Sequence, residues 1–545
     1  MSHNKAEAIS APRKGLVLET SASGAPKAYE RHASGRTVGI VLGLSVLLYS
    51  VLLRLPSLGP DTPVHTDAPP FLQVLALLRG EWAGPVAPFR GEFPLYPYLI
   101  FFANRFVPDW LLAAKWAAFI PSALVPLAVF FGVYLLSRER WPAFFAGFLA
   151  ASSPALIRAA AAPLYDSTFT LTLALLLLAG IWLLQSQSWR AVALVGLALG
   201  VSLAARGLGV FLFVPMFSVI GLLPAASVGR KLAYAALAIA TSLGTAYLIA
   251  QPVRRASAGL QPDRTNCLRQ VISDGILYSE GDRDANVYRL NDAATAFQMD
   301  ESGVCDMGWG QFVRNYGKAQ TRMFAENLKG IILYELVAIL TPFLVFFIPL
   351  TMGAKYLSQP EWRPYALLLG ATCLSFLVFV PAIQYQDRYL VPLMVPVAMA
   401  AGLGCVQLLQ AGNAARLLLA VLLIAALVAG IDGFRRTAVP DQAETNYRSA
   451  CEWIVSEGGA KPFSVMERHH GVYAYLKQPT VFLPVDEAAR VRQYAAHMNV
   501  KYVLAGPDER QHNPRLFVEG SFLHSVKSFG SGAQTVAVLE IVQGS

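Results

Sequence analysis

Long uninterrupted blocks of apolar residues constrain the fold of this chain more than any other feature of its sequence. Segments of roughly 18 or more residues with few charges match the hydrocarbon core of a bilayer, which is about 30 Å thick. Of the 545 residues, 55% are hydrophobic and only 14% are charged, whereas a soluble globular chain carries about 25% charged residues. The sequence therefore predicts an α-helical polytopic membrane protein.

About eleven transmembrane helices are predicted from these blocks. Two of them have soft boundaries, because 190–205 is short and 111–136 contains Lys115 and two prolines. Neighbouring helices and waters can satisfy the backbone groups that such prolines free. The predicted spans are 37–55, 111–136, 141–158, 167–186, 190–205, 208–226, 232–250, 331–351, 364–382, 390–410 and 415–432.

Basic residues in the short loops give these helices a direction. Loops on the cytoplasmic side of a membrane carry an excess of Lys and Arg. With a cytoplasmic N-terminus, every short loop expected on that side contains such residues: Arg138 and Arg140, Arg190, Arg230 and Lys231, Lys355 and Arg363, and Arg416. We therefore expect a multi-pass protein of the inner (plasma) membrane. The net charge of +9 lies largely in the N-terminal tail and these loops, so it does not indicate a nucleic-acid partner.

This topology divides the chain into three predicted parts. Residues 1–36 are polar and lack the apolar stretch and cleavage site of a signal peptide, so we expect a disordered cytoplasmic tail. Residues 37–432 are expected to form the membrane domain, with large external loops at 56–110 and 251–330. Because the number of spans is odd, residues 433–545 are predicted to lie on the periplasmic or extracellular side.

Residues 433–545 differ from the membrane domain in having apolar runs of strand length. Such runs at Pro462–Met466, Tyr502–Ala505 and Thr535–Ile541 alternate with helical stretches at Asn446–Glu457 and Asp486–His497. Short Val-rich runs separated by turn residues and helices predict a small α/β domain.

Two apolar segments in the first external loop are too short to span a bilayer. Pro69–Trp82 places Phe71, Leu72 and Leu75 on one helical face, and Pro94–Phe106 is rich in aromatic residues. We interpret both as helices lying in the membrane interface, where Trp and Tyr are favoured. The alternative is a pair of buried helices in a soluble domain.

The five cysteines include one pair that is positioned for a disulfide bond. Cys267 and Cys305 both fall in the 251–330 loop, where an oxidising exterior permits a bond. Closing a loop of that length adds about 2–4 kcal/mol to stability, and the bonded and free states both remain open. Cys373 and Cys405 lie within spans and are predicted to be packing residues, while Cys451 has no evident partner.

Charged residues at the external ends of the predicted spans are the main indication of chemistry. Ionisable groups near the hydrocarbon are costly and are usually functional or paired. A carboxylate can deprotonate an acceptor hydroxyl, and arginines can bind a phosphate and stabilise it as a leaving group. The alternative for each residue alone is a helix-end charge that reaches the head groups. These residues are Asp67, Asp166, Arg206, Asp387 and Arg388.

Several degenerate motifs surround these residues in a fixed order. Asp67 precedes Leu75–Gly80, an apolar helix ending in a glycine step, and Trp82–Leu99 follows the pattern W-x-x-P…E-x-P-L with Glu92 as its acid. Further motifs are Asp166 at the start of a span, Gly196–Arg206 at the end of one, and Arg388, Tyr389 and Pro392 at the opening of a late one. In order and membrane sidedness they resemble the GT-C superfamily of integral-membrane glycosyltransferases. The nearest resemblance is to the bacterial branch of protein O-mannosyltransferases and the lipid A aminoarabinose transferase.

The resemblance implies roles for individual residues. Asp67 would be the general base on the acceptor, with Glu92 and Asp166 as supporting acidic groups. Arg206 and Arg388 would bind the donor phosphate. The family's lysine is Phe93 here, so Arg90 is the candidate to replace it. His65 is either a ligand for a divalent metal ion or an exposed loop histidine, and no other cofactor is implied.

The implied function is a single inverting displacement in which a sugar moves from a polyprenyl phosphate to a lipid, polysaccharide or protein acceptor outside the cytoplasm. Two alternatives remain. An O-antigen ligase or polymerase would usually place its dominant external loop late in the chain. A lipid-linked-sugar transporter or flippase would require charges and broken helices at mid-bilayer, and Gly207–Gly209 is the only candidate break.

Overall fold

The computed structural model describes most of the chain. The described residues are 27–59, 68–80, 94–223, 226–256, 272–273, 276, 289–295, 304, 306–340, 342–383, 387–457, 463–468, 471–476, 480–519 and 522–542. The chain divides into two compact units, residues 1–42 and 43–545. The packing described below is that of the second unit.

Helices make up the described chain as far as residue 457. The first half contains α1 (Lys27–Arg54), η1 (Leu55–Leu58), α2 (Ala68–Leu78), α3 (Leu95–Asn104), α4 (Trp110–Ser137), α5 (Arg140–Ala151), α6 (Pro154–Ala161), α7 (Asp166–Ser186), α8 (Trp189–Ala205), η2 (Gly207–Leu212), α9 (Phe213–Gly221) and α10 (Val228–Ala256). The second half contains α13 (Trp309–Gly330), the π-helical turn η4 (Ile331–Glu335), α14 (Leu336–Ile339), α15 (Phe343–Leu357), η5 (Pro360–Trp362), α16 (Arg363–Phe379), η6 (Val380–Ala382), η7 (Asp387–Leu393), α17 (Met394–Gln410), α18 (Asn413–Ala438) and α19 (Gln442–Glu457).

The helices match the predicted spans. Within the described residues, seven helices are long and apolar enough to cross a membrane, or nine if each of two bent pairs counts as one span. One such pair is α5 and α6, which are bent by 52° at Ser152 and Ser153. Two further apolar helices, Trp189–Ala205 and Gly207–Gly221, are shorter. The predicted segments overlap these helices, but 331–351 runs across the 103° bend of the second pair and is therefore not one straight span. The polytopic helical fold is confirmed.

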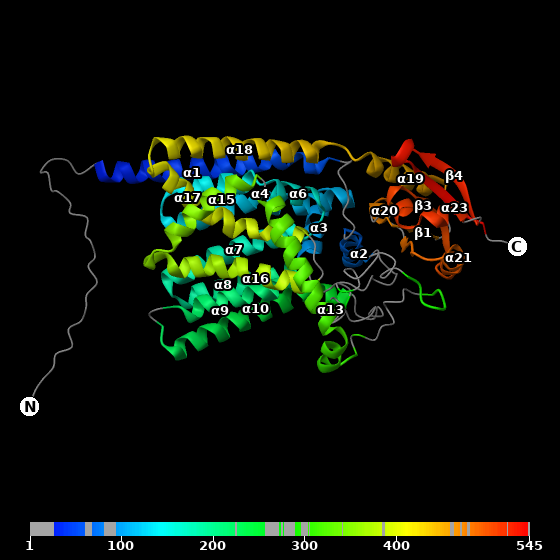
Figure 1. The fold of residues 1–545 in the computed structure, drawn as a ribbon, viewed down its shortest axis with the longest axis horizontal. Coiled ribbons are helices and arrows are strands. Elements are labelled where there is room, and N and C mark those ends of the chain that lie inside the picture. Colours follow the sequence, from blue (N-terminus) through cyan, green and yellow to red (C-terminus); the bar gives the residue numbers. More distant parts are fainter. Residues whose placement is uncertain are drawn as a thin grey trace, which may run out of the picture. The chain divides into compact units, whose positions relative to one another are not determined.

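Small residues allow several of these helices to approach closely. A Cβ atom on Gly404 of α17 would lie 1.8 Å from the carbonyl oxygen of Pro349, and one on Gly353 of α15 would lie 1.9 Å from that of Ala400. Such contacts are typical of membrane helices, which associate through close packing because lipid provides no hydrophobic driving force between them. Figure 1 shows α4, α7, α8, α10, α15, α16 and α17 running side by side.

The two helices predicted for the first loop are present as α2 and α3. Phe71, Leu72 and Leu75 of α2 are buried in one cluster with Tyr96 of α3 and the start of α4. Tyr475 of the C-terminal region also packs against this cluster. At the other end of α3 two aromatic side chains, Phe102 and Phe106, are exposed. Both helices thus pack on protein, and α3 also presents an exposed apolar residue, Phe102, near its end.

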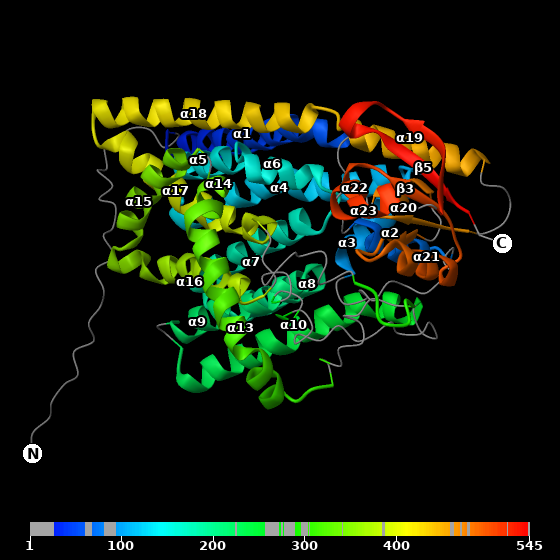
Figure 2. The same cartoon turned by 45° about the vertical axis from the view of Figure 1, so that its right-hand side comes forward.

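The C-terminal region contains a five-stranded sheet of order β2-β1-β3-β5-β4. The strands β1 (Ser464–Glu467), β2 (Thr480–Phe482) and β3 (Val500–Ala505) are parallel, while β5 (Val536–Ile541) is antiparallel to β3 and to β4 (Leu523–Phe529). Its helices are α20 (Gly471–Leu476), α21 (Ala488–His497), α22 (Pro507–His512) and α23 (Pro514–Glu519), and η8 (Gly532–Gln534) precedes β5. Figure 2 shows this sheet with its helices.

Apolar side chains cover both faces of the sheet. Met466 and Val503 belong to one core, whereas their neighbours Val465, Tyr502 and Leu504 belong to another. Successive side chains of a strand point to opposite faces, so one core lies on each side. The predicted small α/β domain is confirmed, with β2 and β4 as strands that the sequence pattern did not indicate.

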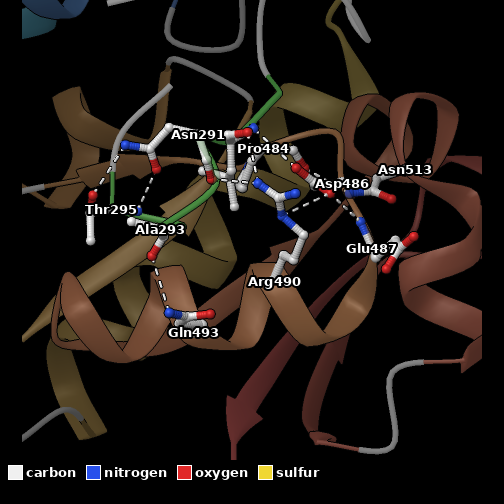
Figure 3. A network of polar contacts seen from close by, with 10 residues as sticks. Asn291, Ala293, Thr295, Pro484, Asp486, Glu487, Arg490, Gln493 and Asn513 are labelled. Atoms are coloured by element: carbon white, nitrogen blue, oxygen red, sulfur yellow. Dashed lines mark hydrogen bonds and ion pairs between the residues drawn. The ribbon is translucent and has the colours of Figure 1, made fainter. Parts of the chain in front are cut away.

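A short piece of the chain between α10 and α13, residues 289–295, is anchored on this domain (Figure 3). Leu290 and Ala294 are buried in the same core as Met466 and Val503. The backbone nitrogen of Leu290 donates to Oδ2 of Asp486 at 3.0 Å, and Nη2 of Arg490 donates to the Leu290 carbonyl at 2.8 Å. Segments about 200 residues apart in sequence are thereby held together.

Candidate functional site

Three of the predicted site residues meet in one buried ionic centre. Asp166 begins α7, Arg206 directly follows α8, and Arg388 lies in η7. Oδ1 of Asp166 accepts a hydrogen bond from Nη1 of Arg206, and Nη1 of Arg388 lies 3.7 Å from Oδ2 of the same carboxylate. The exposed fractions of the three side chains are 3%, 5% and 11%, respectively. One carboxylate therefore bridges two arginines away from water.

Arg206 lies between two helical elements, which fixes where its side chain begins. Its backbone is extended, with φ −164° and ψ 144°, between α8 and the 3-10 turn η2. The nitrogen of Gly209 donates to the Arg206 carbonyl at 2.9 Å. A Cβ atom on Gly209 would lie 2.8 Å from the Ser202 carbonyl group, so only glycine fits this turn without displacement.

Two tyrosines enclose the guanidinium of Arg206. Its central carbon lies 4.6 Å from the ring centre of Tyr165 and 4.2 Å from that of Tyr389. The Arg388 guanidinium also lies 5.6 Å from the Tyr389 ring. Rings in these positions stabilise a cation through their π faces, by about 2 kcal/mol or more where water is excluded. The sandwich leaves the edge of the Arg206 guanidinium as the part that can bind a ligand.

Helix α2 contacts one of these two tyrosines, Tyr165, through the ring of Phe71, and α3 packs against the same ring. The ring of Phe71 in α2 contacts Tyr165 edge-on at 5.1 Å and Tyr96 of α3 at 5.2 Å. Tyr96 is itself fixed, because its hydroxyl donates to the Ala114 carbonyl at 2.9 Å. Sequence reasoning did not assign Tyr165 a role. Its only signal was its position next to Asp166, as Tyr389 is next to Arg388.

This centre contains buried polar atoms that lack a partner among the described residues. Of the described side chains that meet there, two are arginines and one is an aspartate. Within the described part of the chain, Nη2 of Arg206 and Oδ2 of Asp166 are buried and have no hydrogen-bond partner. A buried donor without a partner is costly. A buried guanidinium donor without a partner provides a site for an anion such as a phosphate.

The other predicted site residues lie outside the described residues. These are Asp67, Glu92, Arg90, His65, Cys267 and Cys305. Their roles, and the disulfide bond, stay predictions. The described residues contain no group of three or more His, Cys, Asp or Glu side chains placed to bind a metal ion. Cys405 is buried and Cys373 is partly buried, as expected for packing residues.

Comparison with known protein families gives one match to this chain. The family model of dolichyl-phosphate-mannose-protein mannosyltransferases matches residues 94–249, a segment that contains Asp166 and Arg206. No curated protein sequence matches the chain significantly.

Solved structures share the fold at low sequence identity. ArnT from Cupriavidus metallidurans bound to undecaprenyl phosphate is 14% identical, with a TM-score of 0.56, and the match covers 93% of this chain and 98% of that one. The oligosaccharyltransferase of Archaeoglobus fulgidus, tethered to an acceptor peptide, is 12% identical, with a TM-score of 0.53 and coverage of 92% and 74%. The matched segment and the fold thus confirm the predicted resemblance: the chain has the architecture of the GT-C superfamily of membrane glycosyltransferases.

Proposed function

We propose that this protein is a membrane glycosyltransferase that takes its sugar from a polyprenyl-phosphate donor. The observation that carries the proposal is the buried Asp166–Arg206–Arg388 centre, in which Nη2 of Arg206 has no hydrogen-bond partner among the described residues. A phosphate there would gain a charge-assisted hydrogen bond from Arg206 Nη2. The similar ArnT structure, which contains undecaprenyl phosphate, supports a lipid phosphate as the ligand.

The proposed reaction is a single displacement at the anomeric carbon. The acceptor oxygen attacks this carbon while the bond between the carbon and the phosphate oxygen breaks, and the phosphate leaves with the bonding electrons. Arg206 and Arg388 stabilise the charge that develops on the leaving phosphate. The phosphate leaves without being protonated, so one base is sufficient, and the anomeric configuration is inverted.

Asp67 is proposed as that base, because of its place in the family pattern. Glu92 is assigned a supporting role on the same ground, and Arg90 is proposed to replace the lysine that Phe93 displaces. For Asp166 the geometry favours a positioning role, since both of its oxygens face arginines. A divalent metal ion at His65 and an acceptor outside the cytoplasm, whether lipid, polysaccharide or protein, belong to the proposal as well.

The test combines a variant with identification of the product. Asp67→Asn is expected to abolish sugar transfer while leaving membrane insertion unchanged. Asp109→Asn is the matched control: Asp109 caps α4 by accepting from the backbone nitrogen of Leu112 at 2.7 Å, and asparagine caps a helix equally well. Mass spectrometry of envelope lipids, polysaccharides and proteins from cells with and without the gene would identify the acceptor. Full sugar transfer by Asp67→Asn, or the same glycans in cells with and without the gene, would contradict the proposal.

A further inference from the structure

A second arginine-lined site lies where α2 and α3 end. A cavity of about 330 Å³ is lined by Arg79, Phe101, Asn104 and Arg105. None of these residues belongs to the Asp166 centre, and no step of the proposed reaction uses them. Two guanidinium groups at one cavity raise the question of which anion they bind.

The protein holds both arginines in place without covering them. Nη1 of Arg79 donates to Oδ1 of Asn104, whose own Nδ2 donates to the carbonyls of Val107 at 2.9 Å and Pro108 at 3.1 Å. Asn104 is 8% exposed, whereas Arg79 and Arg105 are exposed. A buried amide thus orients the exposed Arg79 side chain at the cavity.

Aromatic rings restrain the same two guanidinium groups. The central carbon of Arg79 lies 5.9 Å from the Trp110 ring centre, and that of Arg105 lies 5.4 Å from Phe101. Among the described residues, Arg105 forms no ion pair. The N–H edge of the Arg105 guanidinium fits phosphate oxygens in a bidentate manner while its face rests on the Phe101 ring.

Exposed phenylalanines beside the cavity indicate where it lies relative to a bilayer. Phe102 is 64% exposed and Phe106 is 74% exposed, and their rings contact each other at 5.4 Å. This pair follows α3 towards Trp110, where the apolar helix α4 begins. Exposed aromatic pairs are unfavourable in water but favourable in the bilayer interface, where neighbouring arginines reach the depth of the lipid phosphates.

We propose that this cavity binds the phosphate of an anionic membrane lipid, with Arg79 and Arg105 as its ligands and Phe102 and Phe106 inserted beside the acyl chains. The shared chemistry is a phosphate group, and the phenylalanine pair favours a lipid over a free ion as its source. The site is independent of the donor site, so the two assignments can fail separately.

The experiment measures lipid binding by the full-length chain. Native mass spectrometry would compare the purified protein with added dioleoylphosphatidylglycerol and with added dioleoylphosphatidylcholine. The wild type is expected to retain the anionic lipid preferentially, and the double variant Arg79→Gln, Arg105→Gln is expected to bind it about tenfold or more weakly. Arg105→Gln alone is the second variant, because its side chain makes no described ion pair whose loss could disturb the fold.

Arg515→Gln, at an exposed arginine of the C-terminal domain, is the charge-matched control and is expected to bind the lipid like the wild type. A double variant that retains the anionic lipid as the wild type does would overturn the proposal. Displacement of the lipid by inorganic phosphate at an equal concentration would also overturn it, because the site would then recognise a free anion.

Discussion

Two buried carboxylates in this protein are held in opposite ways. Asp166 in the membrane domain is 2% exposed and faces two guanidinium groups. Glu509 in the C-terminal domain is 0% exposed and accepts hydrogen bonds from a hydroxyl and from backbone nitrogens. Its donors include the Tyr447 hydroxyl, the Gly506 nitrogen at 2.9 Å and the Arg468 nitrogen at 2.8 Å.

The difference separates a structural carboxylate from one that serves a ligand site. Glu509 caps the start of α22 and ties it to α19 and to the end of β1, so its oxygens are engaged by the protein itself. Asp166 instead keeps two arginines together, and Nη2 of Arg206 has no hydrogen-bond partner within the described residues. We infer that the first arrangement stabilises a fold and that the second prepares a site for an anion.

The largest expected effect comes from removing the unsatisfied arginine. Arg206→Gln is expected to lower the transfer rate by about 10²–10³-fold, because the leaving phosphate loses a preorganised charged donor. The fold should persist, since Asp166 keeps Arg388 as its ion-pair partner. The measurement pairs the transfer rate of the purified variant with its thermal unfolding temperature. If Arg206→Gln lowers the unfolding temperature but each folded molecule still transfers sugar at the normal rate, Arg206 stabilises the fold as Glu509 does and does not serve a ligand site.

Glu509→Ala is expected to give the opposite outcome. It leaves buried donors without acceptors and should destabilise the C-terminal domain by about 3 kcal/mol. Cys451 is buried in the core next to Tyr447, so its labelling by N-ethylmaleimide, located by peptide mass spectrometry, reports opening of this domain. Labelling should be about 100-fold faster than in the wild type. Unchanged labelling would show that Glu509 is not a structural carboxylate.

A smaller effect is expected from the aromatic sandwich. Tyr389→Leu removes one of the two rings around Arg206 and should weaken binding of the lipid-phosphate donor about tenfold. Tyr389→Phe keeps the ring and should bind the donor like the wild type. We expect a higher KM for the donor in Tyr389→Leu and a wild-type KM in Tyr389→Phe. If the KM rises equally in both variants, the hydroxyl and not the ring supports the site.

The smallest expected effect is a pH dependence in the C-terminal domain. Burial, and then the Glu509 carboxylate, raise the pKa of Tyr447 above its usual value. Below pH 10 the tyrosine is protonated in both the folded and the unfolded state. Above pH 10 only the unfolded state releases the proton, so stability should fall by about 1.4 kcal/mol per pH unit. Cys451 labelling at pH 9 and pH 11 would show this loss, and Tyr447→Phe should reduce it. The labelling rate of Cys451 in the folded wild type would be divided by the rate in the unfolded protein at the same pH. An equal ratio at pH 9 and pH 11 would contradict the predicted loss of stability.

Much of the fold could be predicted because long apolar blocks have few alternatives to membrane helices. The same patterns predicted β1, β3 and β5, whose apolar residues are contiguous. They did not predict β2, which has three residues, or β4, whose side chains are largely exposed. Strands of these kinds are defined by their partners in the sheet and not by their own sequence.

The candidate site was predictable only in part. Helix direction placed Asp166, Arg206 and Arg388 at one end of their spans, and the structure brings these three together. The bridging by one carboxylate and the enclosure by Tyr165 and Tyr389 depend on tertiary contacts that no local pattern contains. The anchoring of residues 289–295 on the C-terminal domain is long-range in the same way.

Comparison of a phosphorylated and a neutral lipid of the same chain length tests the central claim most directly. Undecaprenyl phosphate and undecaprenol would each be titrated onto the full-length wild type and onto the double variant Arg206→Gln, Arg388→Gln. We predict that the wild type binds the phosphate lipid at least about 100-fold more tightly than the alcohol, and that the double variant loses this preference. Equal binding of both lipids by the wild type, or an undiminished preference in the double variant, would contradict the assignment of the Asp166–Arg206–Arg388 centre as the donor phosphate site.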